Sequence, residues 1–138
     1  MLLQANYLIL NLISIVFLPI IYLLSVYLTR WYSIKQEYSE KWEHAIILNA
    51  IWFAVVIVLQ ILIYLLFATQ FFFFLVYYII ALPPNVILGV IAVHHEKLYD
   101  IKSYKTCLKF VAVNLTLLFM ISLGGFYINI VLITSLIY

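Results

Sequence analysis

Charged side chains are scarce in this sequence of 138 residues: only 9% are Asp, Glu, Lys or Arg, whereas 69% are apolar. A typical soluble domain is about half apolar and about a quarter charged. A soluble globule of this size would lack the polar side chains needed to cover its surface. The composition therefore excludes a soluble enzyme, a nucleic-acid-binding domain and a disordered chain. It predicts an integral membrane protein.

Cysteine is nearly absent as well, since Cys107 is the only one. A single cysteine forms no intramolecular disulfide and no cysteine-based metal cluster within one chain. We interpret Cys107 as a small apolar residue near the membrane interface. No motif identifies a chemistry, so we predict neither enzymatic activity nor a cofactor.

The few charges that are present fall into two short windows, residues 30–43 and 96–109. Residues 1–29, 44–95 and 110–138 contain no Asp, Glu, Lys or Arg. A charge in the hydrocarbon core costs several kcal/mol, so charge-free stretches are candidate membrane spans. The first stretch lacks the positive region of a signal peptide, and we interpret it as a retained helix.

The middle charge-free stretch is too long for one crossing. As a single helix its apolar body would be about 73 Å long, whereas the hydrocarbon core is about 30 Å thick. We place its turn at Ala68-Thr69-Gln70, the most polar point between two adequate runs. The sequence thus predicts an all-α membrane protein, one domain over residues 1–138, with spans at about 5–29, 45–67, 71–93 and 110–138.

Proline and glycine predict irregularities within these spans. Pro83-Pro84 removes two backbone donors, so we expect the third helix to break or kink strongly there. Gly89, about one turn later, is expected to permit close approach of another helix. We expect the fourth helix to bend at Gly124-Gly125, and Pro19 to bend the first.

Four spans would place both charged windows on the same side of the membrane. All seven Lys and Arg residues then lie on that side. Because cytoplasmic loops are enriched in these residues, we predict that both windows are cytoplasmic and both termini are on the outer side.

Three histidines flank the middle stretch, and together with Glu96 they are weak candidate metal ligands. A helical hairpin would bring His44 to the same depth as His94, His95 and Glu96. Imidazole and carboxylate groups together bind Zn, Fe or Mn. However, the spacing matches no Glu-x-x-His motif of di-metal bundles, so we favour amphipathic histidines that snorkel at the interface over a metal site.

The second window also carries a basic stripe, because Lys102, Lys105 and Lys109 follow helical spacing. An apolar stripe of Leu98, Ile101 and Leu108 lies beside it. We expect this segment to contact anionic lipid headgroups or a partner, each Lys contributing about 1 kcal/mol against an anionic leaflet.

Amides are the main polar groups within the spans. Asn49, Asn85 and Asn114 fall in the inner half or middle of their spans. We predict that at least two face protein and bond to a neighbouring helix or to carbonyls freed by Pro83-Pro84. A polar substrate path is the alternative, although the absence of ionisable groups in the spans argues against an ion-coupled pump.

These observations favour a small, non-catalytic transmembrane subunit of a larger membrane complex, associated with other transmembrane subunits and with lipid but not with nucleic acid. Energy-transducing complexes contain many such subunits. One alternative is a homo-oligomeric pore or facilitator that uses the break at Pro83-Pro84. Another is a metal- or haem-dependent membrane enzyme that uses His44, His94 and His95.

Overall fold

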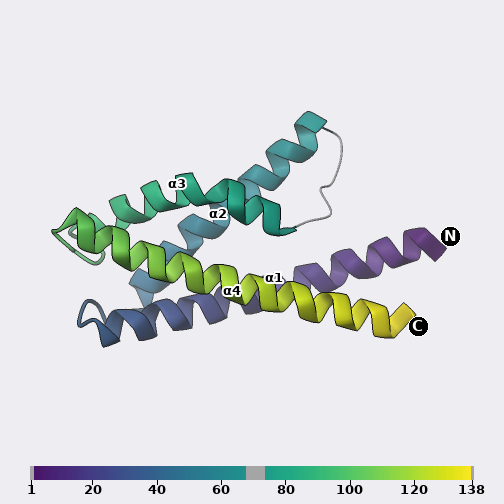
Figure 1. Cartoon of the computed structure of the whole chain (residues 1–138), viewed down its shortest axis with the longest axis horizontal. Coiled ribbons are helices and arrows are strands. Elements are labelled where there is room, and N and C mark those ends of the chain that lie inside the picture. Colours follow the sequence, from purple (N-terminus) through teal and green to yellow (C-terminus); the bar gives the residue numbers. More distant parts are fainter. Residues whose placement is uncertain (1, 68–73, 138) are drawn as a thin grey trace.

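The computed structural model describes the backbone of residues 2–67 and 74–137 and the side-chain environments of residues 16–62, 65–66, 79–132 and 134–136. Its helices are α1 (Leu2–Lys35), α2 (Trp42–Phe67), α3 (Phe74–His94) and α4 (Tyr104–Ile137), and the described residues contain no strand. Each helix contacts the next along the chain, and α4 packs against α1. The helices therefore form a ring in which neighbours run antiparallel (Figure 1).

Three helices are long and apolar enough to cross a membrane, by the stretches Val16–Lys35, Trp42–Leu62 and Tyr104–Leu136. The described part of α3 adds a shorter apolar stretch, Ile79–His94. These lengths fit an all-helical integral membrane protein, since about 20 apolar residues span the hydrocarbon core. The turn expected at Ala68-Thr69-Gln70 lies outside the described residues.

The break predicted at Pro83-Pro84 is wrong, because α3 is helical on both sides of these residues and through them. Each proline removes only its own N–H, which leaves the carbonyls of Ile79 and Ile80 without the usual helical donor. Spanning helices tolerate prolines when local adjustments satisfy such carbonyls. The pore alternative thus loses the broken helix on which it relied.

The helix ends also differ from the predicted spans. Helix α1 continues to Lys35 rather than ending near residue 29, and α4 begins at Tyr104 rather than near residue 110. Charged residues mark where a helix leaves hydrocarbon, but they do not end it. Helix α4 continues through Gly124-Gly125, and the bend expected there stays a prediction.

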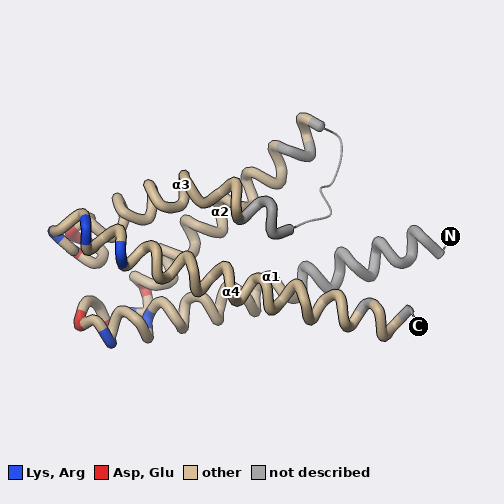
Figure 2. The backbone as a smooth tube through the Cα atoms, viewed as in Figure 1, with Lys and Arg blue, Asp and Glu red and all other residues tan. Residues whose placement is uncertain are grey.

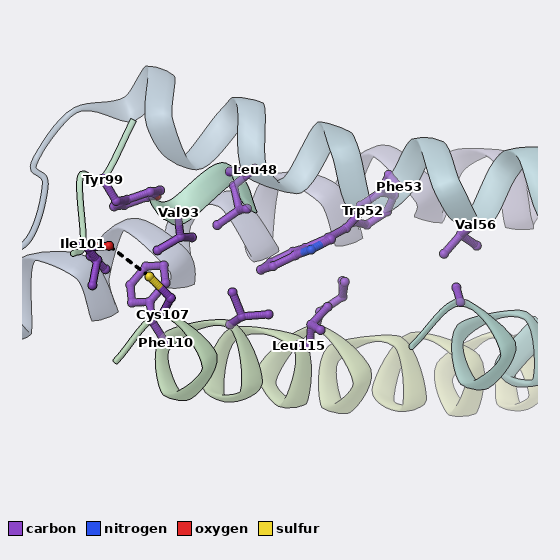
Figure 3. Packing of buried hydrophobic residues seen from close by; sticks show 14 of the residues in the cluster. Leu48, Trp52, Phe53, Val56, Val93, Tyr99, Ile101, Cys107, Phe110 and Leu115 are labelled. Carbon is purple, nitrogen blue, oxygen red and sulfur yellow. Dashed lines mark hydrogen bonds between the residues drawn. The ribbon is translucent and has the colours of Figure 1, made fainter. Parts of the chain in front are cut away.

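The core lies where α2, α3 and α4 meet (Figure 3). Trp52 is fully buried, and its indole N–H donates to the backbone oxygen of Asn85 at 3.0 Å. A Cβ atom at Gly89 would lie 3.0 Å from Trp52 Nε1 and 3.0 Å from Val111 Cγ1. The expected role of Gly89 in close helix approach is therefore confirmed. It lets α3 approach α2 and α4 of this same bundle.

Candidate functional site at the charged end of the bundle

The charged residues gather at one end of the bundle, which we call the charged end (Figure 2). The two connections there are residues 36–41, between α1 and α2, and residues 95–103, between α3 and α4. The N- and C-terminal ends of the chain lie toward the opposite end (Figure 1). Any recognition by charge therefore occurs at these two connections and the helix turns beside them.

The first connection is closed by backbone bonds and one hydroxyl. Glu37 has a positive φ of 61°, Tyr38 N–H donates to Ser33 O at 2.9 Å, and Glu37 N–H donates to Ile34 O at 3.0 Å. This is the Schellman pattern, which commonly ends a helix. The Ser33 hydroxyl donates to Ser39 O at 2.7 Å and accepts from Ser39 N–H at 2.9 Å. The loop is thus fixed by its own atoms.

The second connection is fixed at Ile101, which is buried. Its N–H donates to Val93 O at 3.2 Å, and its carbonyl accepts from His94 Nδ1 at 2.9 Å. The same carbonyl accepts from Cys107 Sγ at 3.1 Å (Figure 3). Because a carbonyl oxygen only accepts, the proton of neutral His94 is on Nδ1. This loop is therefore tied to the end of α3 and the start of α4.

The structure does not assemble the histidines into a ligand set. His44 Nδ1 lies 2.6 Å from Ser39 Oγ, and His95 Nδ1 accepts from Lys97 N–H at 3.2 Å. His94 stacks on Tyr104, with ring centroids 4.5 Å apart. Among the residues with described side chains, no group of three or more His, Cys, Asp or Glu is placed to hold a metal ion, and that includes Glu96.

Aromatic rings join the two connections, and we call them the Phe110 cluster: Tyr32, Tyr38, Tyr99 and Phe110. The centroid of Phe110 lies 5.6 Å from that of Tyr32, 5.4 Å from Tyr38 and 4.9 Å from Tyr99. Burial raises the pKa of the Tyr99 phenol, whose oxygen has no hydrogen-bond partner. The cluster links α1, both connections and α4, and sequence reasoning missed it.

The predicted basic stripe is only partly helical. Lys102, Lys105 and Lys109 are all exposed, but Lys102 precedes α4 and only the other two lie on it. The predicted apolar stripe beside them is wrong, because Ile101 is buried in the core. Its buried side chain and carbonyl anchor the loop, so it does not face the headgroups.

The three candidate packing amides are buried, with exposed fractions of 0% for Asn49 and 2% for both Asn85 and Asn114. Asn49 Nδ2 donates across the α1–α2 interface to Thr29 Oγ1 at 2.9 Å. Asn114 Nδ2 donates to Phe110 O of its own helix at 2.8 Å. The Oδ1 atoms of all three are buried without a hydrogen-bond partner. Only Asn49 therefore bonds to another helix through its side chain.

Sequence reasoning also missed Thr29, which accepts from the Asn49 side-chain amide, and Trp52, which donates to the backbone oxygen of Asn85. Trp52 lies well inside the charge-free part of α2, whereas Thr29 directly precedes Arg30 on α1. The one available signal was the position of Trp52, since tryptophans that anchor a membrane protein lie at the interface rather than inside a span.

Comparisons with known proteins give no match to any family model, to any curated protein or to any solved structure.

Proposed function

We propose that this chain is a four-span, non-catalytic subunit of a larger membrane complex. In this proposal α3 is the fourth span, the charged end is cytoplasmic and both termini are on the outer side. The location of all seven Lys and Arg residues at the charged end supports the orientation, because cytoplasmic loops are enriched in these residues.

The observation that carries the proposal is an exposed row on α4. Ala112, Thr116, Met120 and Gly124 are exposed and follow at intervals of four, so they share one helix face. Three of the four are small. Small residues on a spanning helix allow the backbone of another helix to approach closely. We call these four residues the α4 row.

Gly124 favours a partner helix over lipid as the neighbour of the α4 row. The other two glycines have partners inside the bundle, because a Cβ at Gly125 would lie 3.0 Å from Ile21 Cδ1 and one at Gly89 would meet Trp52. A Cβ at Gly124 would meet nothing within 4 Å. Glycine costs about 1 kcal/mol relative to alanine within a helix, and contact with lipid does not offset this cost. Close packing of a partner helix against Gly124 would offset it.

The charged end supports the non-catalytic part of the proposal. Its two connections, residues 36–41 and 95–103, form hydrogen bonds mainly within themselves and with the adjoining helix turns. Exposed Lys102, Lys105 and Lys109 are available to anionic headgroups, each worth about 1 kcal/mol. We therefore assign this end to anchoring and orientation.

The test introduces a leucine at one of two exposed positions, Gly124 on α4 or, as the control, Ala54 on α2. Affinity purification of the tagged chain from native membranes should recover transmembrane partners in fixed ratio. Gly124→Leu should reduce that recovery at least about ten-fold without lowering the melting temperature of the purified chain, because a Cβ atom there meets nothing within 4 Å.

Ala54→Leu is the matched control, since Ala54 is also exposed but lies on α2. It should leave the recovery unchanged. Loss of the partner with Ala54→Leu but not with Gly124→Leu would overturn the α4 row as the interface. A wild-type chain that purifies as a stable monomer without partners, or that is catalytically active alone, would overturn the proposed function.

A further inference from the structure

Arg30 is the only arginine in the sequence, and it lies where α1 passes from the charge-free stretch into the charged end. Its Nε–H donates to the backbone oxygen of Glu40 at 2.9 Å, and its Cζ lies 4.3 Å from the ring centroid of Trp42. The connection and the start of α2 therefore hold the guanidinium in place. The ring centroid of Tyr27 lies 6.5 Å from that of Trp42. We call Arg30, Trp42 and Tyr27 the Arg30 site.

The Arg30 site leaves most of its hydrogen-bond donors unused. A guanidinium has five N–H groups, and four of them are on the two Nη atoms. Within the part of the chain whose side chains are described, the bond through Nε is the one hydrogen bond of Arg30, and no carboxylate accepts from it. The side chain is only half-buried, so an acceptor from outside the chain can reach the Nη groups. A guanidinium fork binds carboxylate and phosphate groups through two parallel hydrogen bonds.

The surface beside the site is apolar on the side away from the charged end. Residues before Arg30 on α1 and after Trp42 on α2 lie on that side (Figure 2). The exposed side chains there are Tyr27 (55%) and Leu23 (65%) on α1 and Ile46 (44%) on α2. They lie at helical spacing from the cation and the ring. A molecule whose anionic group binds Arg30 would therefore place an apolar part along these residues, which describes a membrane lipid rather than a soluble anion.

Charge balance narrows the class of lipid. Residues 30–43 contain three basic and three acidic side chains, so this window has no net charge. Residues 96–109, in contrast, contain four lysines and two acids. A window with a net positive charge attracts anionic headgroups, and the first window does not. Recognition at the Arg30 site therefore depends on the guanidinium fork, which a phosphate diester satisfies even in a lipid that is neutral as a whole.

We propose that the Arg30 site binds the phosphate of a zwitterionic phospholipid, whose acyl chains lie along Tyr27, Leu23 and Ile46. The Nη groups of Arg30 donate to two phosphate oxygens, and the Trp42 ring holds the guanidinium by a cation–π contact. The site requires that the charged end lies at a membrane surface. It depends neither on a partner subunit nor on the side of the membrane that this end faces.

The direct test uses the single arginine as a probe. The whole chain, labelled with ¹³C at arginine Cζ, is placed in phosphatidylcholine nanodiscs without inorganic phosphate, and solid-state NMR measures the dephasing of Cζ by ³¹P. Two N–H···O bonds of about 2.8 Å hold the phosphorus about 4 Å from Cζ, so we expect strong dephasing. A folded chain without dephasing would overturn the proposal.

Two tryptophan variants test whether the contact belongs to a fixed site. Trp42→Leu should lower the dephasing at least about two-fold, because the guanidinium loses its cation–π contact. Trp31→Leu is the matched control, since Trp31 is equally exposed, at 48% against 46%, but its ring centroid lies 5.1 Å from Lys35 Nζ. It should leave the dephasing unchanged. Equal dephasing in both variants would mean that any arginine at this depth meets phosphate, which would overturn a fixed site.

The composition of the sample identifies the ligand. In maltoside micelles that contain inorganic phosphate but no lipid, dephasing should be absent. Dephasing as strong as in nanodiscs would assign the site to free phosphate and overturn the phospholipid. Replacement of part of the phosphatidylcholine by phosphatidylglycerol should leave the dephasing unchanged. Dephasing that appears only with the anionic lipid would overturn the zwitterionic ligand.

Native mass spectrometry of the chain extracted from these nanodiscs into maltoside gives a readout that does not use the label. A fraction of the wild-type chain should retain one phospholipid. Arg30→Lys keeps the charge but loses the fork, so it should lower that fraction at least about two-fold. Lys35→Arg is the control and should leave it unchanged. Equal lipid retention by Arg30→Lys and the wild type would overturn the bidentate contact.

Discussion

The Ser33 hydroxyl is a single group that closes the connection between α1 and α2. It is fully buried, donates to Ser39 O and accepts from Ser39 N–H. Removal of a buried partner leaves the remaining polar groups unsatisfied. We expect Ser33→Ala to lower the free energy of unfolding by about 1–3 kcal/mol in detergent.

Ser135→Ala is the control for this change, because Ser135 is exposed and donates only to Leu132 O of its own helix. Its effect on denaturant unfolding should be close to zero. Equal unfolding curves for Ser33→Ala and the wild type would show that the loop is held by its backbone bonds alone.

Tyr99 gives the molecule a pH dependence in the alkaline range. Burial raises the pKa of this phenol above the ordinary value of about 10. Below pH 10 the phenol is neutral in both the folded and the unfolded chain, so it adds no pH dependence. Above pH 10 only the unfolded chain ionises readily, and stability falls as the pH rises.

Tyr99→Phe should therefore reduce the loss of melting temperature between about pH 9.5 and 11. At pH 7 the variant should be as stable as the wild type or more stable, because the Tyr99 oxygen has no hydrogen-bond partner and the ring contact with Phe110 is kept. The same alkaline slope in both proteins would contradict the burial of this phenol. Tyr38, whose pKa is also raised, accounts for part of the slope that remains.

At the scale of elements, the contact of α3 with α2 and α4 depends on Gly89. A Cβ there would lie 3.0 Å from both Trp52 Nε1 and Val111 Cγ1, and neither fully buried side chain has room to move. Overpacking of this kind typically costs about 1–3 kcal/mol. We expect Gly89→Ala to lower stability by that amount and to weaken the Trp52 bond to Asn85.

Gly124→Ala is the matched control for Gly89→Ala, since nothing lies within 4 Å of its Cβ position. In the isolated chain it should be neutral or stabilising by up to about 1 kcal/mol, because alanine favours a helix over glycine. Thermal unfolding followed by circular dichroism would measure both. Destabilisation by Gly124→Ala of the same size as by Gly89→Ala would contradict the packing described for α3.

The helices themselves were predictable from the sequence, because stretches without charged residues indicate segments that can lie in the hydrocarbon core of a membrane. Their ends were less predictable, since Arg30 and Lys105 continue helices beyond the predicted spans. The uninterrupted helix at Pro83-Pro84 was not predictable from a rule that treats each lost donor as a break. The outcome depends on whether the freed carbonyls are satisfied locally.

The candidate site was predictable only where polarity stood out. Asn49, Asn85 and Asn114 are conspicuous in apolar helices and are buried, but only Asn49 bonds to another helix through its side chain, whereas at least two of the three were expected to do so or to bond to the freed carbonyls. Trp52 stood out only by its position within a span, and the direction in which it points was not predictable, because a helix that is apolar on every side has no polar face to show which side points inward. Its central position became visible only with the neighbouring helices.

At the scale of the whole molecule, the bundle is closed at one end and spread at the other. The Phe110 cluster joins α1, both connections and α4 at the charged end. Away from that end, the α2–α3 pair diverges from the α1–α4 pair (Figure 1). The closed end is also the charged end, so in the proposed orientation this end of the bundle faces the cytoplasm and the other faces the outer side.

This orientation leads to a prediction that tests the number of spans. Both connections lie at the same end, so four crossings place residues 36–41 and 95–103 on the same side. Glu37→Cys and Lys97→Cys are exposed positions for a membrane-impermeant maleimide, and the buried native Cys107 gives little background. We expect both to react in inside-out vesicles and neither to react in intact cells, because basic loops are retained on the cytoplasmic side.

The unsubstituted chain is the control for residual labelling of Cys107. Labelling of the two introduced cysteines from opposite sides would mean an odd number of crossings between them, so that α3 or α2 fails to span and the four-span arrangement is wrong. Labelling of both from outside would keep the four spans but reverse the orientation. The basic residues at the charged end would then have failed to act as the cytoplasmic anchor that their one-sided distribution predicts.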